Sequence, residues 1–114
     1  MADFSTWQNE IANDDGNALP VSEEKASTSS VTQVAGSVTS VTLKAANSSR
    51  LGLTIYNDST ATLYVKFGAT ASTTSYTVQM GTDDYYEVPF GYTGIVDGIW
   101  DSATGNAYVT ELTS

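Results

Sequence analysis

The chain contains no histidine and no cysteine, which leaves its carboxylates as the plausible catalytic side chains. This excludes Ser-His-Asp triads, cysteine nucleophiles and zinc sites that use histidine or cysteine. Asp83, Asp84 and Glu87 lie near one expected turn, and Asp97 and Asp101 flank one expected strand. A glycosidase needs two carboxylates that face each other across a cleft. Because nothing marks such a cleft and adjacent acids at turns are usually turn formers, we expect no enzymatic activity.

Oxygen ligands suited to calcium gather near the N-terminus, at Asp14, Asp15, Asn17, Glu23 and Glu24. Their order does not match the EF-hand loop, which needs oxygen ligands at fixed alternating positions around a glycine. We therefore expect a solvated acidic segment, no bound metal and no cofactor.

Aromatic side chains offer a different chemistry, the stacking of sugar rings. Tyr85, Tyr86, Tyr92 and Trp100 would form such a platform if the fold brought them together. The alternative is that they pack in the core and against loops, because aromatic residues also fill strands well. The sequence leaves both interpretations open.

Arg50 is the only arginine and stands just before an expected strand. Its guanidinium would pair with Asp97 or Asp101 inside the domain, or else anchor an interface. We favour the structural pair.

Length and charge exclude several classes of partner. The 114 residues amount to one domain, and 13 acids against 4 bases give a net charge of −9. Nucleic acid and anionic membrane surfaces are disfavoured, because affinity for either depends on Lys and Arg. No apolar run of about 18 residues exists to span a membrane. The start, Met1–Phe4, lacks the basic and apolar regions of a signal peptide, so we expect synthesis in a cytoplasm.

Composition divides the chain near residue 30. Residues 1–30 hold six of the acids and few β-branched apolar residues, and they end in the linker-like tract Ala26–Ser30. Residues 31–114 carry nearly all of the Val, Tyr, Thr and Ile. We expect an extended N-terminal arm over residues 1–30 and a β domain over residues 31–114.

Within the arm, Ser5–Gln8 fits a capping box. Phe4, Trp7 and Ile11 follow at spacings that place them on one face of a short amphipathic helix. A helix of about nine residues is not stable alone in water, so its apolar stripe must dock on its own domain, a neighbouring subunit or a larger partner.

The β domain shows short strands with turn signals about every ten residues, which favours an all-β antiparallel sandwich, jelly roll or barrel of seven or eight strands. Residues 51–67 predict a hairpin, and Pro89 predicts a strand end or a sheet edge. In residues 95–101 the inward face is either Val96 and Trp100 or Ile95 and Ile99. Seven strands are located, at residues 38–45, 51–56, 63–67, 76–80, 86–90, 95–101 and 107–112.

Lysine side chains at the edge of a sheet usually prevent the edge strand from pairing with another chain, and lysine is scarce in this sequence. This composition favours packing against other subunits.

The chain contains two successive sequence patterns, R-x-x-x-x-I-x-N-x-S-x-x-x-L-Y-V-x-x-G and then Y-x-x-P-x-G-Y-T-G. In these patterns it resembles small β-rich virion proteins of tailed bacteriophages. The resemblance covers roughly residues 50–101 and carries no catalytic residues. It implies a structural module such as a capsid decoration (cement) protein, a head fibre or a tail appendage. The segments that carry it are Arg50–Ser59, Leu63–Gly68, Tyr76–Met80, Asp84–Gly94 and Val96–Trp100.

Of these placements we expect a capsid decoration protein, made in the host cytoplasm and bound to the major capsid protein, or to another virion protein, on the capsid exterior. A homotrimer would match the local threefold positions of an icosahedral shell. The alternative is a carbohydrate-binding or appendage module of a head or tail fibre, with Tyr85, Tyr92 and Trp100 as its platform. A small glycoside-processing enzyme that depends on Asp97 or Asp101 is the remote third alternative.

Overall fold

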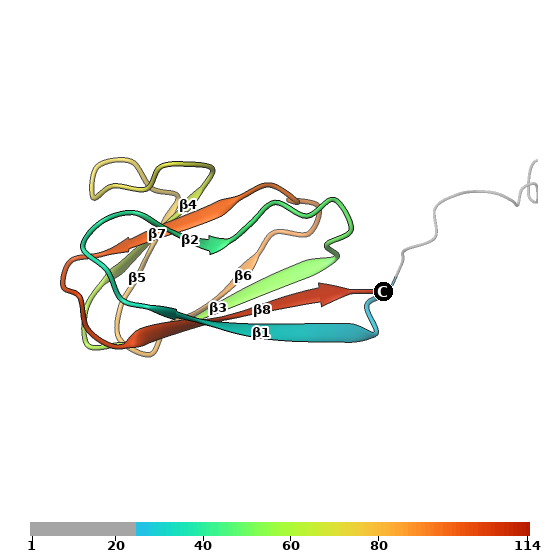
Figure 1. The fold of residues 1–114 in the computed structure, drawn as a ribbon, viewed down its shortest axis with the longest axis horizontal. Helices are drawn as coiled ribbons and strands as arrows, with labels where there is room; N and C mark the ends of the chain where they lie inside the picture. The colour runs from blue at the N-terminus through green and yellow to red at the C-terminus, as the bar shows by residue number, and fades with distance from the viewer. Residues whose placement is uncertain (1–24) are drawn as a thin grey trace, which may run out of the picture.

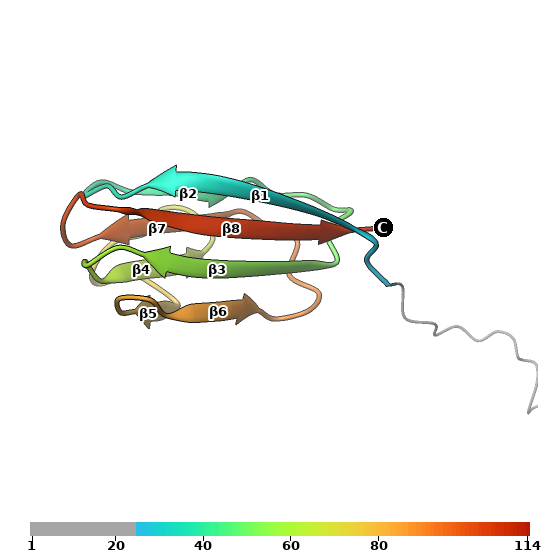
Figure 2. The same ribbon diagram turned by 90° about the horizontal axis from the view of Figure 1, so that it is seen from below.

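The computed structural model describes residues 25–114, which form eight strands in two four-stranded sheets. We call the sheet with the order β1-β8-β3-β6 sheet A and the sheet with the order β2-β7-β4-β5 sheet B. Figures 1 and 2 show the two sheets as stacked layers. In chain order, the strands are β1 (Thr28–Ala35), β2 (Val41–Lys44), β3 (Gly52–Asp58), β4 (Leu63–Phe67), β5 (Val78–Met80), β6 (Tyr85–Val88), β7 (Val96–Trp100) and β8 (Asn106–Thr113).

The strand pairing is that of a jelly roll. Strand β1 pairs with β8, β2 with β7, β3 with β6 and β4 with β5, all antiparallel. The chain therefore forms one long double-stranded ribbon, and the β3–β8 and β4–β7 pairings roll that ribbon into two sheets. A pair of Greek keys in eight strands is the jelly-roll arrangement. The expected all-β antiparallel sandwich is confirmed.

The core lies between the sheets and follows the period-two pattern of the strands. Leu53 and Ile55 of β3 point inward and are buried, while Thr54 and Tyr56 between them face outward. In β7 the buried apolar side chains are Val96 and Trp100, so these two residues and not Ile95 and Ile99 form the inward apolar face. Ile95 and Ile99 are only half-buried.

The expected hairpin over residues 51–67 is wrong. Strand β3 belongs to sheet A and β4 to sheet B, so the chain crosses from one sheet to the other after Asp58. Asn57 holds this corner, because its amide donates to the carbonyl oxygens of Ala61 (2.9 Å) and Met80 (3.2 Å). The alternation of each strand was visible in the sequence, but alternation shows which side chains point inward and not which sheet a strand joins.

The expected strand bounds also needed correction at several ends. Strand β6 stops at Val88, directly before Pro89, as the missing N–H of proline predicted. Phe90 therefore lies beyond β6, and Tyr76 lies before the start of β5. The first strand, β1, was not located in the sequence, because only Val31 and Val34 mark it as apolar.

The expected linker Ala26–Ser30 is wrong in its second half. Residues 28–30 are part of β1, where Thr28 lies opposite Thr113. The backbone N–H of Ser27 also donates to the carbonyl of Thr113 at 2.9 Å. The described chain thus begins next to its C-terminus (Figure 1).

Candidate interaction surfaces

Several expected site residues lie outside the described residues. They are Phe4, Trp7 and Ile11 of the arm, together with the calcium candidates Asp14, Asp15, Asn17, Glu23 and Glu24.

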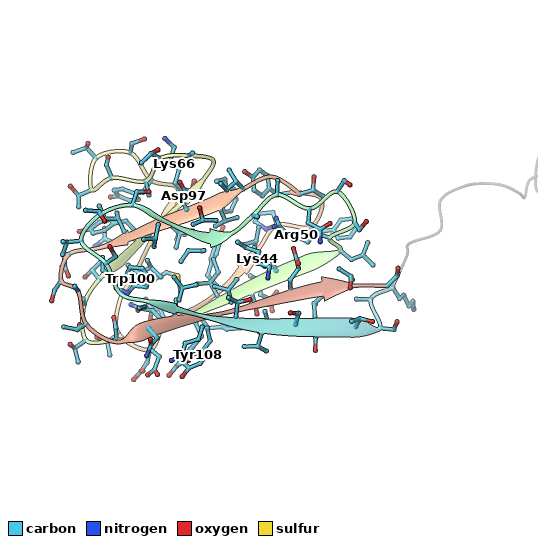
Figure 3. All side chains as sticks on the ribbon, in the orientation of Figure 1. Lys44, Arg50, Lys66, Asp97, Trp100 and Tyr108 are labelled. Carbon is cyan, nitrogen blue, oxygen red and sulfur yellow. The ribbon has the colours of Figure 1, made fainter. Side chains whose placement is uncertain are left out.

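The four aromatic residues expected to form a platform do not lie together. Trp100 is 1% exposed and lies between the sheets, where it cannot stack on a sugar (Figure 3). Tyr92 stacks on Phe67 at 4.9 Å between ring centroids, and its hydroxyl donates to the carbonyl of Ile95. Tyr86 packs against the core, while Tyr85 is 59% exposed on the other face of sheet A. The alternative of core and loop packing therefore holds for Trp100, Tyr86 and Tyr92.

Arg50 is the centre of a buried polar cluster. Its Nε donates to Oε2 of Glu111 at 2.9 Å, and its two other nitrogens donate to the carbonyl oxygens of Ala45 (2.7 Å) and Gly94 (2.9 Å). Lys44 adds a second cation, 4.0 Å from the other oxygen of Glu111. The structural pair is confirmed, but its expected partners Asp97 and Asp101 are wrong, since the acid is Glu111.

Because Arg50 is 4% exposed, it is not available as an interface anchor or as part of a sugar platform. Its planar guanidinium suits a site where one carboxylate and several carbonyl groups converge. Its function is to tie β8 to the loops that precede β3 and β7.

The five carboxylates considered for catalysis have separate structural surroundings. Asp84 accepts the N–H of Gly81 at 2.7 Å and acts as a turn former, whereas Asp101 accepts the N–H of Thr62 at 3.1 Å and links the end of β7 to the loop before β4. Asp97 is 5% exposed and accepts a long bond from Ser40. Within residues 25–114, no group of three or more acidic side chains is arranged to hold a metal ion.

Strand β1 forms an edge of sheet A and lacks the features that usually prevent an edge strand from pairing with another chain. It has eight residues and contains no charge, proline or glycine. The other edge strands are shorter, with four residues in β6, four in β2 and three in β5. Short or charged edges resist pairing with other chains, whereas a long uncharged edge offers unpaired backbone groups to a partner. Val31, which is 62% exposed, adds an apolar side chain to this edge.

The outer face of sheet A carries a row of tyrosines that the sequence reading missed. Tyr56 lies directly opposite Tyr85 on one side and Tyr108 on the other. Figure 3 shows Tyr108 on the side of sheet A that points away from the core. The signal was present in the sequence, because Tyr56 alternates with the apolar Leu53 and Ile55 and must therefore face outward.

Two acids orient this row. The Tyr56 hydroxyl donates to Asp83 at 2.9 Å, and the Tyr85 hydroxyl donates to Glu87 at 3.2 Å. The hydrogen bond to Asp83, together with partial burial and the negative charge nearby, raises the pKa of Tyr56 above its ordinary value of 10.0. Two of the three hydroxyl groups in the row, those of Tyr56 and Tyr85, are therefore held by carboxylates.

Comparisons of the chain with family models, with curated proteins and with solved structures find no match. No helix in residues 25–114 is long and apolar enough to cross a membrane.

Proposed function

We propose that this chain is a non-enzymatic virion protein of a tailed bacteriophage, most specifically a capsid decoration (cement) protein on the outside of the head shell. Its partner would be the major capsid protein or another virion protein. The resemblance of residues 50–101 to small β-rich virion proteins supports this proposal. So does the jelly roll, an architecture that viral capsid domains use widely, although lectin domains use it too.

The observation that carries the proposal is the edge strand β1. Its eight uncharged residues would be a liability in a protein that works alone, because they can pair with a strand of any neighbour. In a protein that works by contact with other subunits, the same edge is a binding element of the strand-addition kind. It supports a homo-oligomer, which we propose is a trimer on the threefold positions of the shell.

The charge distribution supports a place on the outside of the shell. Of the four bases in the described residues, Arg50 and Lys44 face Glu111, Lys66 bonds to Ser75 and to the carbonyl of Thr70, and Lys25 alone is exposed, before the start of β1. The acids Asp58, Asp83 and Glu87 are exposed. Such a surface repels packaged DNA, since binding to phosphates requires exposed Lys and Arg.

Residues 1–24 precede β1 in the sequence and carry Phe4, Trp7 and Ile11. An extended chain spans about 3.3 Å per residue, so this segment is long enough to reach across a subunit boundary. In the proposed mechanism it adds buried apolar area between neighbouring capsomers, and each bound copy stabilises the assembled shell by mass action.

The test is co-sedimentation of the purified chain with empty head shells of the phage that encodes it. We expect the full chain to pellet with the shells and a chain lacking residues 1–24 to stay in the supernatant. This deletion leaves β1 intact, because β1 begins at Thr28. Light scattering on the same samples gives the oligomer mass.

A matched pair of full-length variants identifies the contact. Replacing Phe4, Trp7 and Ile11 together by Ala should release the chain from the shells, whereas Asn9→Ala, outside both the apolar stripe and the capping box, should not. If the full chain does not sediment with shells, the proposed function is wrong. If the truncated chain still binds, the docking of the arm is wrong.

A further inference from the structure

The outer face of sheet A has the shape and chemistry of a ligand platform. The cross-strand register places Tyr108, Tyr56 and Tyr85 in one line over β8, β3 and β6, and Gln33 of β1 extends that line. Neighbouring strands are about 4.8 Å apart, so the register places one aromatic residue on each of three successive strands. Such a series suits a linear ligand with a repeating unit.

A hollow adjoins the row. Its volume of about 330 Å³ is near the lower limit for small-molecule sites. Gly52 and Leu112 line the hollow from β3 and β8, and Leu112 lies so close to Gly52 that an added Cβ would be 3.0 Å from its side chain. Tyr85 and Glu87 line the hollow from β6, and Phe90, which is 75% exposed, lines it from the loop after β6. The hollow and the row share Tyr85, so the two form one continuous surface.

The charge of this surface narrows the class of ligand. Glu87 and Asp83 hydrogen-bond to the row, and Asp58 stands at its margin, opposite Asn106. Arg50 is buried, Lys66 lies on the outer side of sheet B, and Lys44 points toward Glu111 (Figure 3). Lys25 is exposed, but it precedes β1 and stands eight residues (33 − 25) before Gln33, the member of the line on that strand. A polyanion would be repelled here, because its charges would meet carboxylates without a matching cation.

We propose that the outer face of sheet A binds a neutral polysaccharide. A sugar ring offers an apolar C–H face, which matches the face of a tyrosine, and hydroxyl groups at its edge, which donate to carboxylates and amides. The phenols of Tyr56 and Tyr85 are already held by Asp83 and Glu87, so little conformational freedom is lost when a ligand binds. This inference goes beyond the proposed function and does not rest on it.

The test is affinity electrophoresis of the full-length protein in gels that contain dextran, galactomannan or hydroxyethyl cellulose, with alginate as the anionic comparison. We expect at least one neutral polymer to retard the protein more strongly than alginate does. Replacing Tyr56, Tyr85 and Tyr108 together by Ala should weaken binding by roughly tenfold or more, since the aromatic contacts are lost.

Tyr76→Ala is the matched control, because Tyr76 is an exposed tyrosine that packs on Tyr64 of sheet B. It should leave retardation unchanged. If circular dichroism shows that the triple variant does not fold, retardation of the single variant Tyr85→Ala is measured instead, since the Tyr85 side chain is mostly exposed. The inference is overturned if none of the three neutral polymers retards the protein, if alginate binds best, or if a folded variant lacking the row binds as well as the wild type.

Discussion

Sheet A has two faces that are built from alternate residues of the same strands, and they differ in what their polar groups contact. On the inner face, Asn57 and Glu111 are buried, and their side-chain partners are other protein groups. On the outer face, Tyr56, Tyr85 and Tyr108 are partly exposed to solvent. The inner polar groups have no access to water, whereas the outer ones do.

This difference separates residues that determine the fold from residues that are free to serve binding. A buried polar group without a partner costs about 1–3 kcal/mol, so the inner face requires specific partners for Asn57 and Glu111. An outer side chain can hydrogen-bond to water instead, so folding does not require three tyrosines in a row there. The buried Arg50 therefore contributes to stability, whereas the tyrosine row is not required for folding and is free to serve the binding that we propose.

The largest expected effect is at the inner face, in Glu111→Leu. This change leaves the Arg50 guanidinium buried without its carboxylate, and breaking a buried ion pair in this way costs about 3–5 kcal/mol of unfolding free energy. Urea denaturation followed by circular dichroism measures the loss. Glu111→Gln is the control, because its amide oxygen still accepts from Arg50, and it should cost clearly less. Equal losses in the two variants would mean that the ion pair does not hold this end of the sandwich.

The second effect is at the corner between the sheets, in Asn57→Ala. Trp100 Nε1 donates to the Asn57 side chain at 3.2 Å, and the Asn57 amide bonds to three carbonyl oxygens, those of Ala61, Met80 and Gly81. Removing the amide leaves buried groups unpaired, so we expect a loss of about 1–3 kcal/mol in the same urea experiment.

The neighbouring residue, Asp58, provides the control for Asn57→Ala. Asp58 is exposed, so Asp58→Ala should change the unfolding free energy by no more than about 0.5 kcal/mol. A loss of similar size at both positions would contradict the distinction between the two faces.

The smallest effect is on the outer face and concerns titration. The Tyr56 pKa lies above 10.0 because the neutral phenol donates to Asp83. Since the folded-state pKa exceeds the unfolded one, this contribution to stability is present below pH 10 and is lost as the pH rises through the folded-state pKa. Asp83→Asn should move the Tyr56 pKa down toward its ordinary value. A ¹³C NMR titration of ring-labelled tyrosine follows it, and an unchanged Tyr56 pKa would show that Asp83 does not hold the phenol.

Much of the fold was predictable from local patterns. The alternation of Leu53 and Ile55 with Thr54 and Tyr56 predicted β3 and its inward face, and Pro89 predicted the end of β6. The predicted hairpin over residues 51–67 was wrong. Whether β4 pairs with β3 or crosses to the other sheet depends on contacts of Asn57 with residues far along the chain.

The candidate site was predictable only in part. Tyr85 was singled out in the sequence, but it was grouped with Trp100, which is buried in the core. Its actual neighbours, Tyr56 and Tyr108, lie 29 residues before it and 23 residues after it (85 − 56 and 108 − 85), and only the strand register brings them together.

By itself, the sequence determined that the domain is an antiparallel β structure and, through the missing histidine and cysteine, that no catalytic site depends on either residue. Those properties depend on composition and on a period of two, which are local. The tertiary structure alone decided the jelly-roll order, the pairing of Arg50 with Glu111 and the tyrosine row. Each of these depends on which strands become neighbours, and that choice is made by the packing of the whole chain, since alternation within one strand carries no information about the strand beside it.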